Sequence, residues 1–367
     1  MALSQVGLER LNTDTTDKLG ERKNLIINGA MQVAQRGTSF TDIGGSAGVY
    51  TLDRFRSGFT MNAGRYTITQ DSNSPDGFGK SLKVDVTTQE PSLNVASGVQ
   101  ISQFFEGQDL QQLQKGTSSA KSMTLSFYVK STTIGTYIVE FQDQDNSRIN
   151  NKAYTINNPN TWEKKTITVE GDTTGAFTND NNASLLVQFF LAAGTNFTSG
   201  TLQNTWGTNT NANRAVGQTN LFASTSNDWA ITGVQLEVGS VATDFEHRSY
   251  AQELALCQRY FEKSFAQGVA PAQNHAGQVG YYSLLNIGSR LRSANIPFKV
   301  VKRTSSPTMT FFNPFAANAN ARIPFTSTDL NNIAIDTSGD NWFGFTSTDT
   351  TPSPTYCHLH WTADTEL

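Results

Sequence analysis

The sequence predicts an all-β protein: a jelly-roll-type β-sandwich, then a short linking α-helix, then a smaller C-terminal β-rich domain. Three observations favour this class. Alternating apolar and polar residues recur at short intervals, clusters of Gly, Asn and Pro separate these segments, and helical periodicity is absent between them. Helices between successive strands would instead indicate a parallel α/β fold, so the pattern favours antiparallel sheets.

The individual strands follow from residue alternation. The clearest is 122–131, where the apolar side chains share one face. Segment 184–193 is apolar on both faces, which predicts a strand inside a sheet with both sides covered. Further strands are expected at 65–71, 80–88, 136–143 and 162–171.

Residues 228–267 mark the change from sandwich to helix. A strand is expected over 228–238, with one face formed by Ala230, Thr232, Val234, Leu236 and Val238. Ser249 and Gln252 then have the spacing of a capping box, which predicts a helix of about four turns. The predicted division is therefore a polar segment 1–23, a sandwich 24–248, a helix 249–267 and a β-rich unit 268–367.

Composition narrows the class of protein. Charged residues make up only 16% and the formal net charge is −4, so no basic excess is present to neutralise the phosphates of a nucleic acid. The N-terminal residues lack the apolar core of a secretory signal, and no apolar run is long enough for a membrane-spanning helix. Cys257 and Cys357 are expected to be free, buried thiols, as in a protein assembled in the bacterial cytoplasm.

Several blocks of the sequence resemble virion proteins of tailed bacteriophages, chiefly tail fibres and receptor-binding appendages with a carbohydrate-binding-module-like jelly roll. They are NLIINGAMQVAQRGTSF at 24–40, GVQLEVGSVATDFEHRSYAQELALCQRYF at 233–261 and HWTADTEL at 360–367. The resemblance implies a homotrimer located in the virion, on the tail or another appendage. It also implies attachment to other virion proteins through segment 1–23.

The resemblance further implies a non-enzymatic role in adhesion to a host-surface glycan or lipopolysaccharide, without a cofactor. Two alternatives remain at this point. One is a structural role as a capsid decoration or head fibre, and the other is a tailspike that depolymerises polysaccharide. The sequence contains no nucleophile motif, P-loop or metalloprotease motif. Asp143 and Asp145 are the nearest candidates for a glycosidase pair, and a solvated turn explains them more simply.

The long segment 194–227 holds the candidate glycan-binding residues. Phe197, Trp206 and Phe222 stand there on a background rich in Gly and Asn. Aromatic rings stack on the apolar face of a sugar while amides meet its hydroxyl groups. The alternative is that these rings pack onto the sandwich or a neighbouring subunit.

Two further sets of residues have structural or metal-binding interpretations. Asp53, Arg54, Glu246 and Arg248 are charges among apolar neighbours, and we expect them to form ion pairs that brace the first and last strands of the sandwich. His358 and His360 lie two apart in an expected strand, so their rings share a face. In a three-fold fibre they could bind a metal on the axis, although ordinary interface residues show the same spacing.

Overall fold

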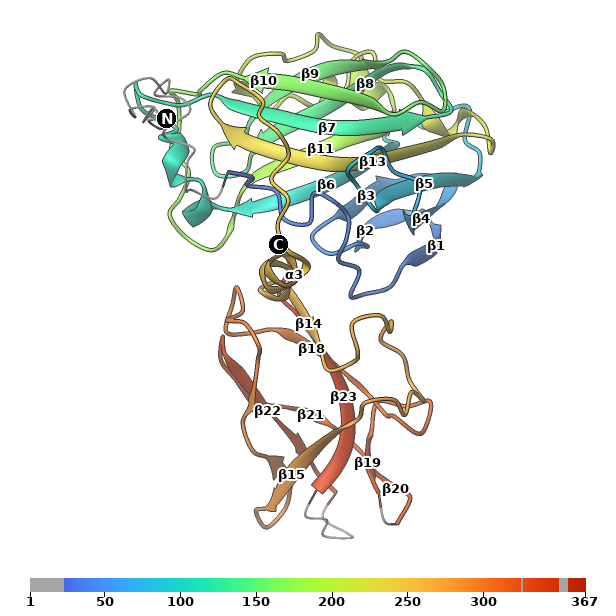
Figure 1. Ribbon diagram of the computed structural model, residues 1–367, viewed down its shortest axis with the longest axis vertical. Helices are drawn as coiled ribbons and strands as arrows, with labels where there is room; N and C mark the ends of the chain where they lie inside the picture. Colours follow the sequence, from blue (N-terminus) through green and yellow to red (C-terminus); the bar gives the residue numbers. More distant parts are fainter. Residues whose placement is uncertain (1–22, 325, 350–355) are drawn as a thin grey trace, which may run out of the picture.

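The computed structural model describes residues 23–324, 326–349 and 356–367. Two β-rich units lie one above the other, and helix α3 lies between them (Figure 1). The predicted fold class is therefore confirmed. The expected attachment segment 1–23 lies outside the described residues except for Lys23.

In the described part of the chain, the N-terminal unit consists of two antiparallel sheets packed face to face (Figure 1). The first sheet has the order β1 (Ser39–Ile43), β4 (Arg65–Asp71), β5 (Ser81–Thr88), β13 (Asp228–Val238), β7 (Met123–Ser131), β10 (Glu163–Val169). The second has the order β12 (Gly207–Thr208), β9 (Arg148–Ile156), β8 (Gly135–Asp143), β11 (Ala183–Ala193), β6 (Gly98–Glu106), β3 (Arg56–Thr60), β2 (Ser46–Tyr50).

The facing sides of the two sheets form one apolar core. In β7, Leu125, Phe127 and Val129 are fully buried in it, as their alternation predicts. Strand β11 lies between β8 and β6, and both of its faces are covered. Its inner face joins the main core, whereas Phe190 on the outer face belongs to a separate small cluster under segment 194–218. The prediction of a covered central strand is confirmed.

Strand β13 differs from the predicted single-face pattern. Trp229, Ile231, Val234 and Leu236 all belong to the sandwich core, although their numbers change from odd to even. The pairing of β13 with β7 is irregular between Thr232 and Gln235, and Gly233 within this bulge has φ = +61°. The extra residue reverses which positions face inward. The expected single face is therefore wrong: Val234, Leu236 and Val238 lie on the core side, whereas Ala230 and Thr232, before the bulge, do not belong to the core.

Helix α3 (Tyr250–Gln258) begins at the predicted capping box. The Ser249 hydroxyl accepts from the backbone N–H of Gln252, and the Gln252 side chain accepts from the backbone N–H of Ser249. The helix is shorter than predicted, because Phe261–Lys263 forms strand β14, which pairs with the last strand of the C-terminal unit. No helix in the described residues is long and apolar enough to cross a membrane.

The C-terminal unit is built around β23 (Tyr356–Asp364), which pairs with four other strands, β14, β15 (Gly280–Asn286), β18 (Thr308–Phe312) and β19 (Ala321–Ile323). The remaining described strands extend this arrangement: β16 (Leu291–Ser293), β17 (Ile296–Pro297), β20 (Thr328–Leu330), β21 (Ala334–Ser338) and β22 (Trp342–Ser347). Cys357, Leu359, Trp361 and Ala363 form the inner face of β23 and the centre of a second apolar core.

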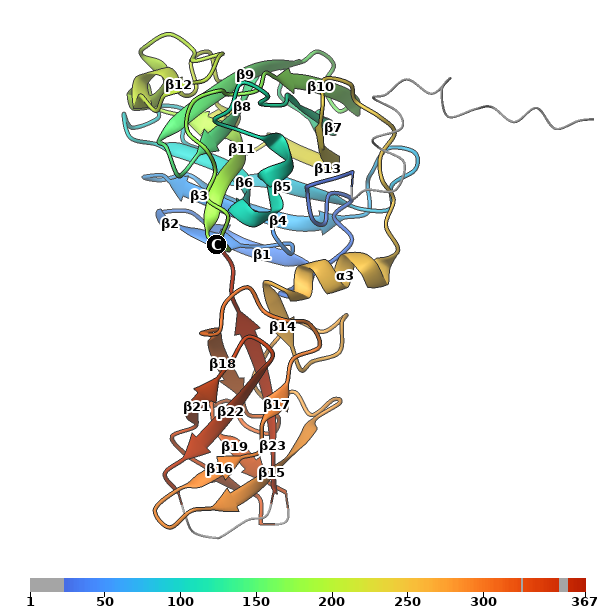
Figure 2. The ribbon, with the colours of Figure 1, turned by 90° about the vertical axis from the view of Figure 1, so that its left-hand side faces the viewer.

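The end of the chain returns to the junction between the two units (Figure 2). There Ile27 and Val33 of the sandwich pack with Cys257 and Tyr260, and Leu367 lies against this cluster. Charged groups fill the rest of the junction. Glu366 forms ion pairs with both Arg36 and Arg54, and each of these arginines also lies over an aromatic ring, of Phe261 or of Tyr260.

Candidate functional site

The outer face of the second sandwich sheet carries a transverse row of polar side chains. The row runs across five neighbouring strands, and each residue lies opposite the next one in it. Its members are Arg56 of β3, Ser102 of β6, Gln188 of β11, Glu140 of β8 and Asn151 of β9. Residues directly opposite in an antiparallel ladder point to the same side of the sheet. The sequence alternation places apolar neighbours inward, so this row faces away from the core.

Glycines lower the sheet surface next to this row. Gly48 of β2 lies opposite Gly58 of β3, which in turn lies opposite Gln100 of β6. A Cβ atom on Gly48 would stand 1.9 Å from Nη2 of Arg56, and one on Gly98 would stand 2.8 Å from Nε2 of Gln100. The missing side chains thus leave the space in which the long side chains of Arg56 and Gln100 lie along the sheet.

Segment 194–218 lies over the same sheet face, on the side away from β2 and β3. The outward side chains of Ile138 and Phe190 are apolar, and Phe197, in the short helix α2 (Thr195–Thr198), packs against their cluster. Arg214 lies beside the same ring, with its guanidinium carbon 5.6 Å from the ring centroid of Phe197. The apolar patch on β8 and β11 therefore holds this long segment on the sheet face.

Between this segment and β2–β3 lies a shallow depression of about 260 Å³, which we call the sheet-face groove. Its lining comes from β2, β3, β6, β11 and the two connecting segments, and consists of Ala47, Arg56, Gly58, Phe59, Thr60, Ala96, Gly98, Gln100, Gln188, Phe197 and Arg214.

The polar groups of the groove differ in how they are satisfied. Arg214 donates to both carboxylate oxygens of Glu140, over 2.9 and 2.6 Å, and Gln188 donates to the same carboxylate, which is fully buried. By contrast, no hydrogen bond or ion pair in the described structure ends on the guanidinium of Arg56 or the side-chain amide of Gln100. These two groups are free to meet a ligand.

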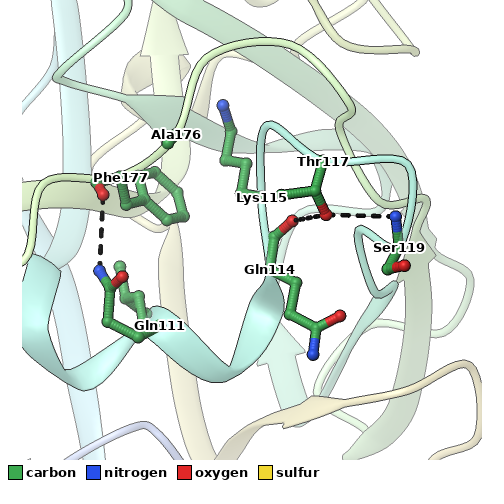
Figure 3. A pocket seen from close by; sticks show the side chains of 8 residues that line it. Gln111, Gln114, Lys115, Thr117, Ser119, Ala176 and Phe177 are labelled. Atoms are coloured by element: carbon green, nitrogen blue, oxygen red, sulfur yellow. Dashed lines mark hydrogen bonds between the residues drawn. The ribbon is translucent and has the colours of Figure 1, made fainter.

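A larger depression of about 360 Å³ is a weaker candidate (Figure 3). The Gln111 amide in its wall donates to the carbonyls of Gly107 and Thr178, over 2.9 and 3.1 Å. Lys115 is buried, and its ammonium meets the Asp143 carboxylate at 2.5 Å. The polar groups of this second depression therefore hold the β6–β7 connection in place, and few remain for a ligand.

The three predicted glycan-binding aromatics occupy different environments. Phe197 lines the groove. Trp206 packs against the sandwich core elsewhere, donates from Nε1 to the carbonyl of Glu170 over 2.8 Å and lies under the ammonium of Lys115. Phe222 is fully buried, with its ring edge-on to Tyr66. The structure thus corrects the expectation for Phe222, because a ring in the core cannot stack on a sugar.

The predicted ion pairs exist in part. Arg248 meets Glu246 at 2.9 Å and also Glu253 of α3. Arg54 pairs with Glu366 of the C-terminal unit, a partner that the sequence did not indicate. The expectation that Asp53 or Glu246 meets an arginine is thus confirmed at Glu246. Asp53 forms no ion pair in the described residues and instead accepts from the backbone and the side chain of Gln35. Burial raises the pKa of the Asp53 carboxyl, and nearby Arg36 opposes this rise.

The two histidines do not form a metal site with other described residues. No group of three or more His, Cys, Asp or Glu side chains with suitable placement occurs in the described part of the chain. His360 accepts from or donates to the Ser264 hydroxyl at 2.9 Å and stacks on Phe265. His358 lies between the rings of Tyr281 and Phe315. Whether three chains bring these rings to one axis stays a prediction.

The solvated turn expected for Asp143 and Asp145 is wrong for Asp143. Asp143 is fully buried and bonded to Lys115 and Asn146, whereas Asp145 accepts from the backbone of Thr178. Both cysteines are buried and free, as expected, and burial raises the pKa of each thiol.

Sequence reasoning missed Arg56, Gln100, Gln188 and Arg214. The strands β3 and β6 were not predicted either, and the only local signal is the spacing of Arg56 from Gly58 and of Gly98 from Gln100, two residues apart in each case. That spacing puts each pair on one face of its own strand. It does not reveal that β3 and β6 are neighbours.

No protein-family model matches the sequence, and no curated protein matches it. Among solved structures, the enzymatically active domain of bacteriophage CBA120 tailspike protein 4 is 15% identical with a TM-score of 0.31. The match covers 59% of this chain and 21% of the tailspike chain.

Two carbohydrate-binding modules are similar to a comparable extent. TmCBM61, solved with β-1,4-galactotriose, is 10% identical with a TM-score of 0.30, over 59% of this chain and 99% of that one. The family 11 module of the Clostridium thermocellum cellulase Lic26A-Cel5E is 12% identical with a TM-score of 0.27, over 56% and 99%. Identities and TM-scores this low identify neither a family nor a ligand for this chain.

Proposed function

We propose that this chain is a non-enzymatic adhesion protein of a tailed-phage virion appendage, and that its sheet-face groove binds glycans of the host surface. The observation that carries the proposal is the pairing of free polar groups with an aromatic ring. The Arg56 guanidinium and the Gln100 amide have no partners in the described structure, and Phe197 stands on the opposite wall. Amide and guanidinium groups bond sugar hydroxyls, while the ring covers an apolar sugar face.

The composition of the groove supports binding without catalysis. Its described lining contains no Asp or Glu side chain, and the buried Glu140 beneath it is engaged by Arg214 and Gln188. Glycoside hydrolysis ordinarily requires two carboxyl groups placed on either side of the scissile bond. A groove without such a pair holds a glycan but lacks the usual acid and nucleophile.

The wider role rests on the sequence resemblance. A virion location, a homotrimer and docking through segment 1–23 belong to the same proposal. The groove is shallow, so a single sugar contact is weak, and repetition over three chains and several appendages raises the avidity by orders of magnitude. Immunogold labelling of intact particles is expected to place the protein on the tail. Labelling of the head would favour the capsid-decoration alternative.

The direct test uses purified protein and oligosaccharides released from host lipopolysaccharide or capsule. Gln100→Ala removes one hydrogen-bonding group and is expected to weaken binding about fivefold, and Phe197→Ala at least as much. Isothermal titration calorimetry measures both. Gln32→Ala, an exposed glutamine outside the groove, is the matched control.

Unchanged affinity in both groove variants would remove the groove from the proposal. Incubation with intact polysaccharide is expected to release no oligosaccharide, and release by the wild-type protein would contradict the non-enzymatic assignment.

A further inference from the structure

The sheet-face groove carries one uncompensated positive charge. Of its two arginines, Arg214 is neutralised by the bidentate contact with Glu140. Glu90, which lies beside the groove wall at Ser97, accepts from the Ser97 hydroxyl and from the backbone N–H groups of 62–64. Glu366 is engaged by Arg36 and Arg54. Arg56 has no carboxylate within ion-pair distance in the described residues.

The guanidinium of Arg56 lies close to the backbone of two glycines. It lies directly above Gly48, where an added Cβ would stand 1.9 Å from Nη2 and 2.3 Å from Cζ. It also borders Gly58, whose added Cβ would stand 3.3 Å from Nη1. The guanidinium therefore lies over two glycines that are opposite each other in the sheet. The Gln100 amide oxygen is next to it, 3.4 Å from the Cβ added to Gly58. The groove thus holds a planar cation with its donors unused.

We infer that the groove selects an anionic glycan, with Arg56 binding a carboxylate or phosphate group on the sugar. This inference rests on the proposed function and names the class of its ligand. A guanidinium presents parallel N–H donors that match the two oxygens of a carboxylate or phosphate, and such charge-assisted pairs are stronger than neutral hydrogen bonds. Gln100 and Phe197 contact the uncharged part of the same sugar unit.

The experiment compares matched acidic and neutral ligands. One pair is a uronic-acid-containing capsule oligosaccharide and its carboxyl-reduced form. The other is a phosphorylated lipopolysaccharide core oligosaccharide and the same material after phosphatase treatment. The wild-type protein is expected to prefer the acidic member of at least one pair by tenfold or more, and this preference is expected to shrink as salt is raised. The pair that shows it identifies the source of the charge.

Three variants assign the preference to Arg56. Arg56→Gln is expected to lower affinity for the acidic ligand about tenfold to a hundredfold while changing affinity for its neutral partner less than about threefold. Arg290→Gln, which removes the same charge from an exposed turn of the C-terminal unit, is expected to change neither. Gly48→Ala keeps the arginine but displaces its guanidinium, and is expected to reproduce part of the loss.

The outcomes separate the two proposals. If acidic and neutral ligands bind equally, and Gln100→Ala weakens both while Arg56→Gln weakens neither, the anionic specificity is wrong and the glycan-binding groove stands. If Gln100→Ala, Phe197→Ala and Arg56→Gln all leave binding unchanged, or no ligand binds, both proposals fail. Equal losses in Arg56→Gln and Arg290→Gln would indicate a general charge effect and overturn the assignment to Arg56.

Discussion

At the scale of single residues, His358 has the least compensated environment of the predicted candidates. It is 7% exposed, and neither ring nitrogen has a hydrogen-bond partner in the described structure. The Tyr281 ring stands edge-on at 4.3 Å and Phe315 lies on another side. Burial disfavours the charged imidazolium and lowers the pKa of His358 below its ordinary value of 6.5.

This environment predicts a loss of stability in acid. The unfolded chain binds a proton near pH 6.5, whereas the folded chain does so only at lower pH, so the free energy of unfolding falls as the pH drops below about 6.5. His358→Phe is expected to reduce that dependence and to leave stability at pH 7.5 unchanged or about 1 kcal/mol higher. Urea unfolding at pH 7.5 and 5 measures both. An identical pH dependence in the variant would contradict the assignment.

At the scale of elements, the bulge in β13 decides which side chains enter the sandwich core. Gly233 combines φ = +61° with close neighbours, because an added Cβ would stand 2.7 Å from Cζ of Phe78 and 3.0 Å from Cδ2 of Tyr128. Gly77 also has positive φ, +87°, but an added Cβ would meet nothing within 4 Å. Alanine variants at the two glycines therefore distinguish two contributions to the free energy of unfolding, the strain of a left-handed backbone and the steric overlap with neighbouring side chains.

Gly77→Ala is expected to lower the free energy of unfolding by about 1–2 kcal/mol, the cost of a left-handed non-glycine residue. Gly233→Ala carries the same cost and a further loss of about 1–3 kcal/mol from the contacts with Phe78 and Tyr128. Chemical denaturation of both variants measures the difference. Equal losses would mean that the aromatic rings move aside without cost.

Elements with a strong local pattern were predictable. Strand β7 and the covered strand β11 follow from periodicity, and the start of α3 follows from its cap. The end of α3 was not predictable from the sequence, because β14 is a strand only through its pairing with β23, about a hundred residues later. The groove was missed for the same reason. Phe197 was named from composition, but Arg56, Gln100 and Arg214 meet only through the order β3–β6–β11 and the folding of segment 194–218 onto the sheet.

At the scale of the whole molecule, the two β units are joined by buried charges as well as by α3. Glu366 meets Arg36 and Arg54, and Glu106 of the sandwich accepts from Arg259 and Tyr260 beyond the helix. A buried ion pair adds little compared with apolar packing, but removal of one partner leaves a buried charge without compensation. The junction therefore fixes how the units lie relative to each other.

Glu366→Gln is expected to destabilise the folded chain by about 3–5 kcal/mol, because the buried Arg54 loses its carboxylate partner while Arg36 keeps only that of Asp364. The double variant Arg54→Met with Glu366→Gln is expected to recover part of this loss. Guanidinium denaturation compares the two with the wild type, and Arg290→Gln serves as a surface-charge control. A loss below about 1 kcal/mol in Glu366→Gln would show that solvent reaches the junction.

Strand β23 has a consequence for biosynthesis. It is the last strand of the C-terminal unit in sequence, yet it lies between β15 and β19 at one end and between β14 and β18 at the other. While the ribosome is still translating, these four strands have no template to pair with, so this unit folds only after Tyr356–Asp364 has emerged from the exit tunnel. A nonsense mutation just before Tyr356 would therefore yield a finished sandwich attached to an unfolded, protease-sensitive tail.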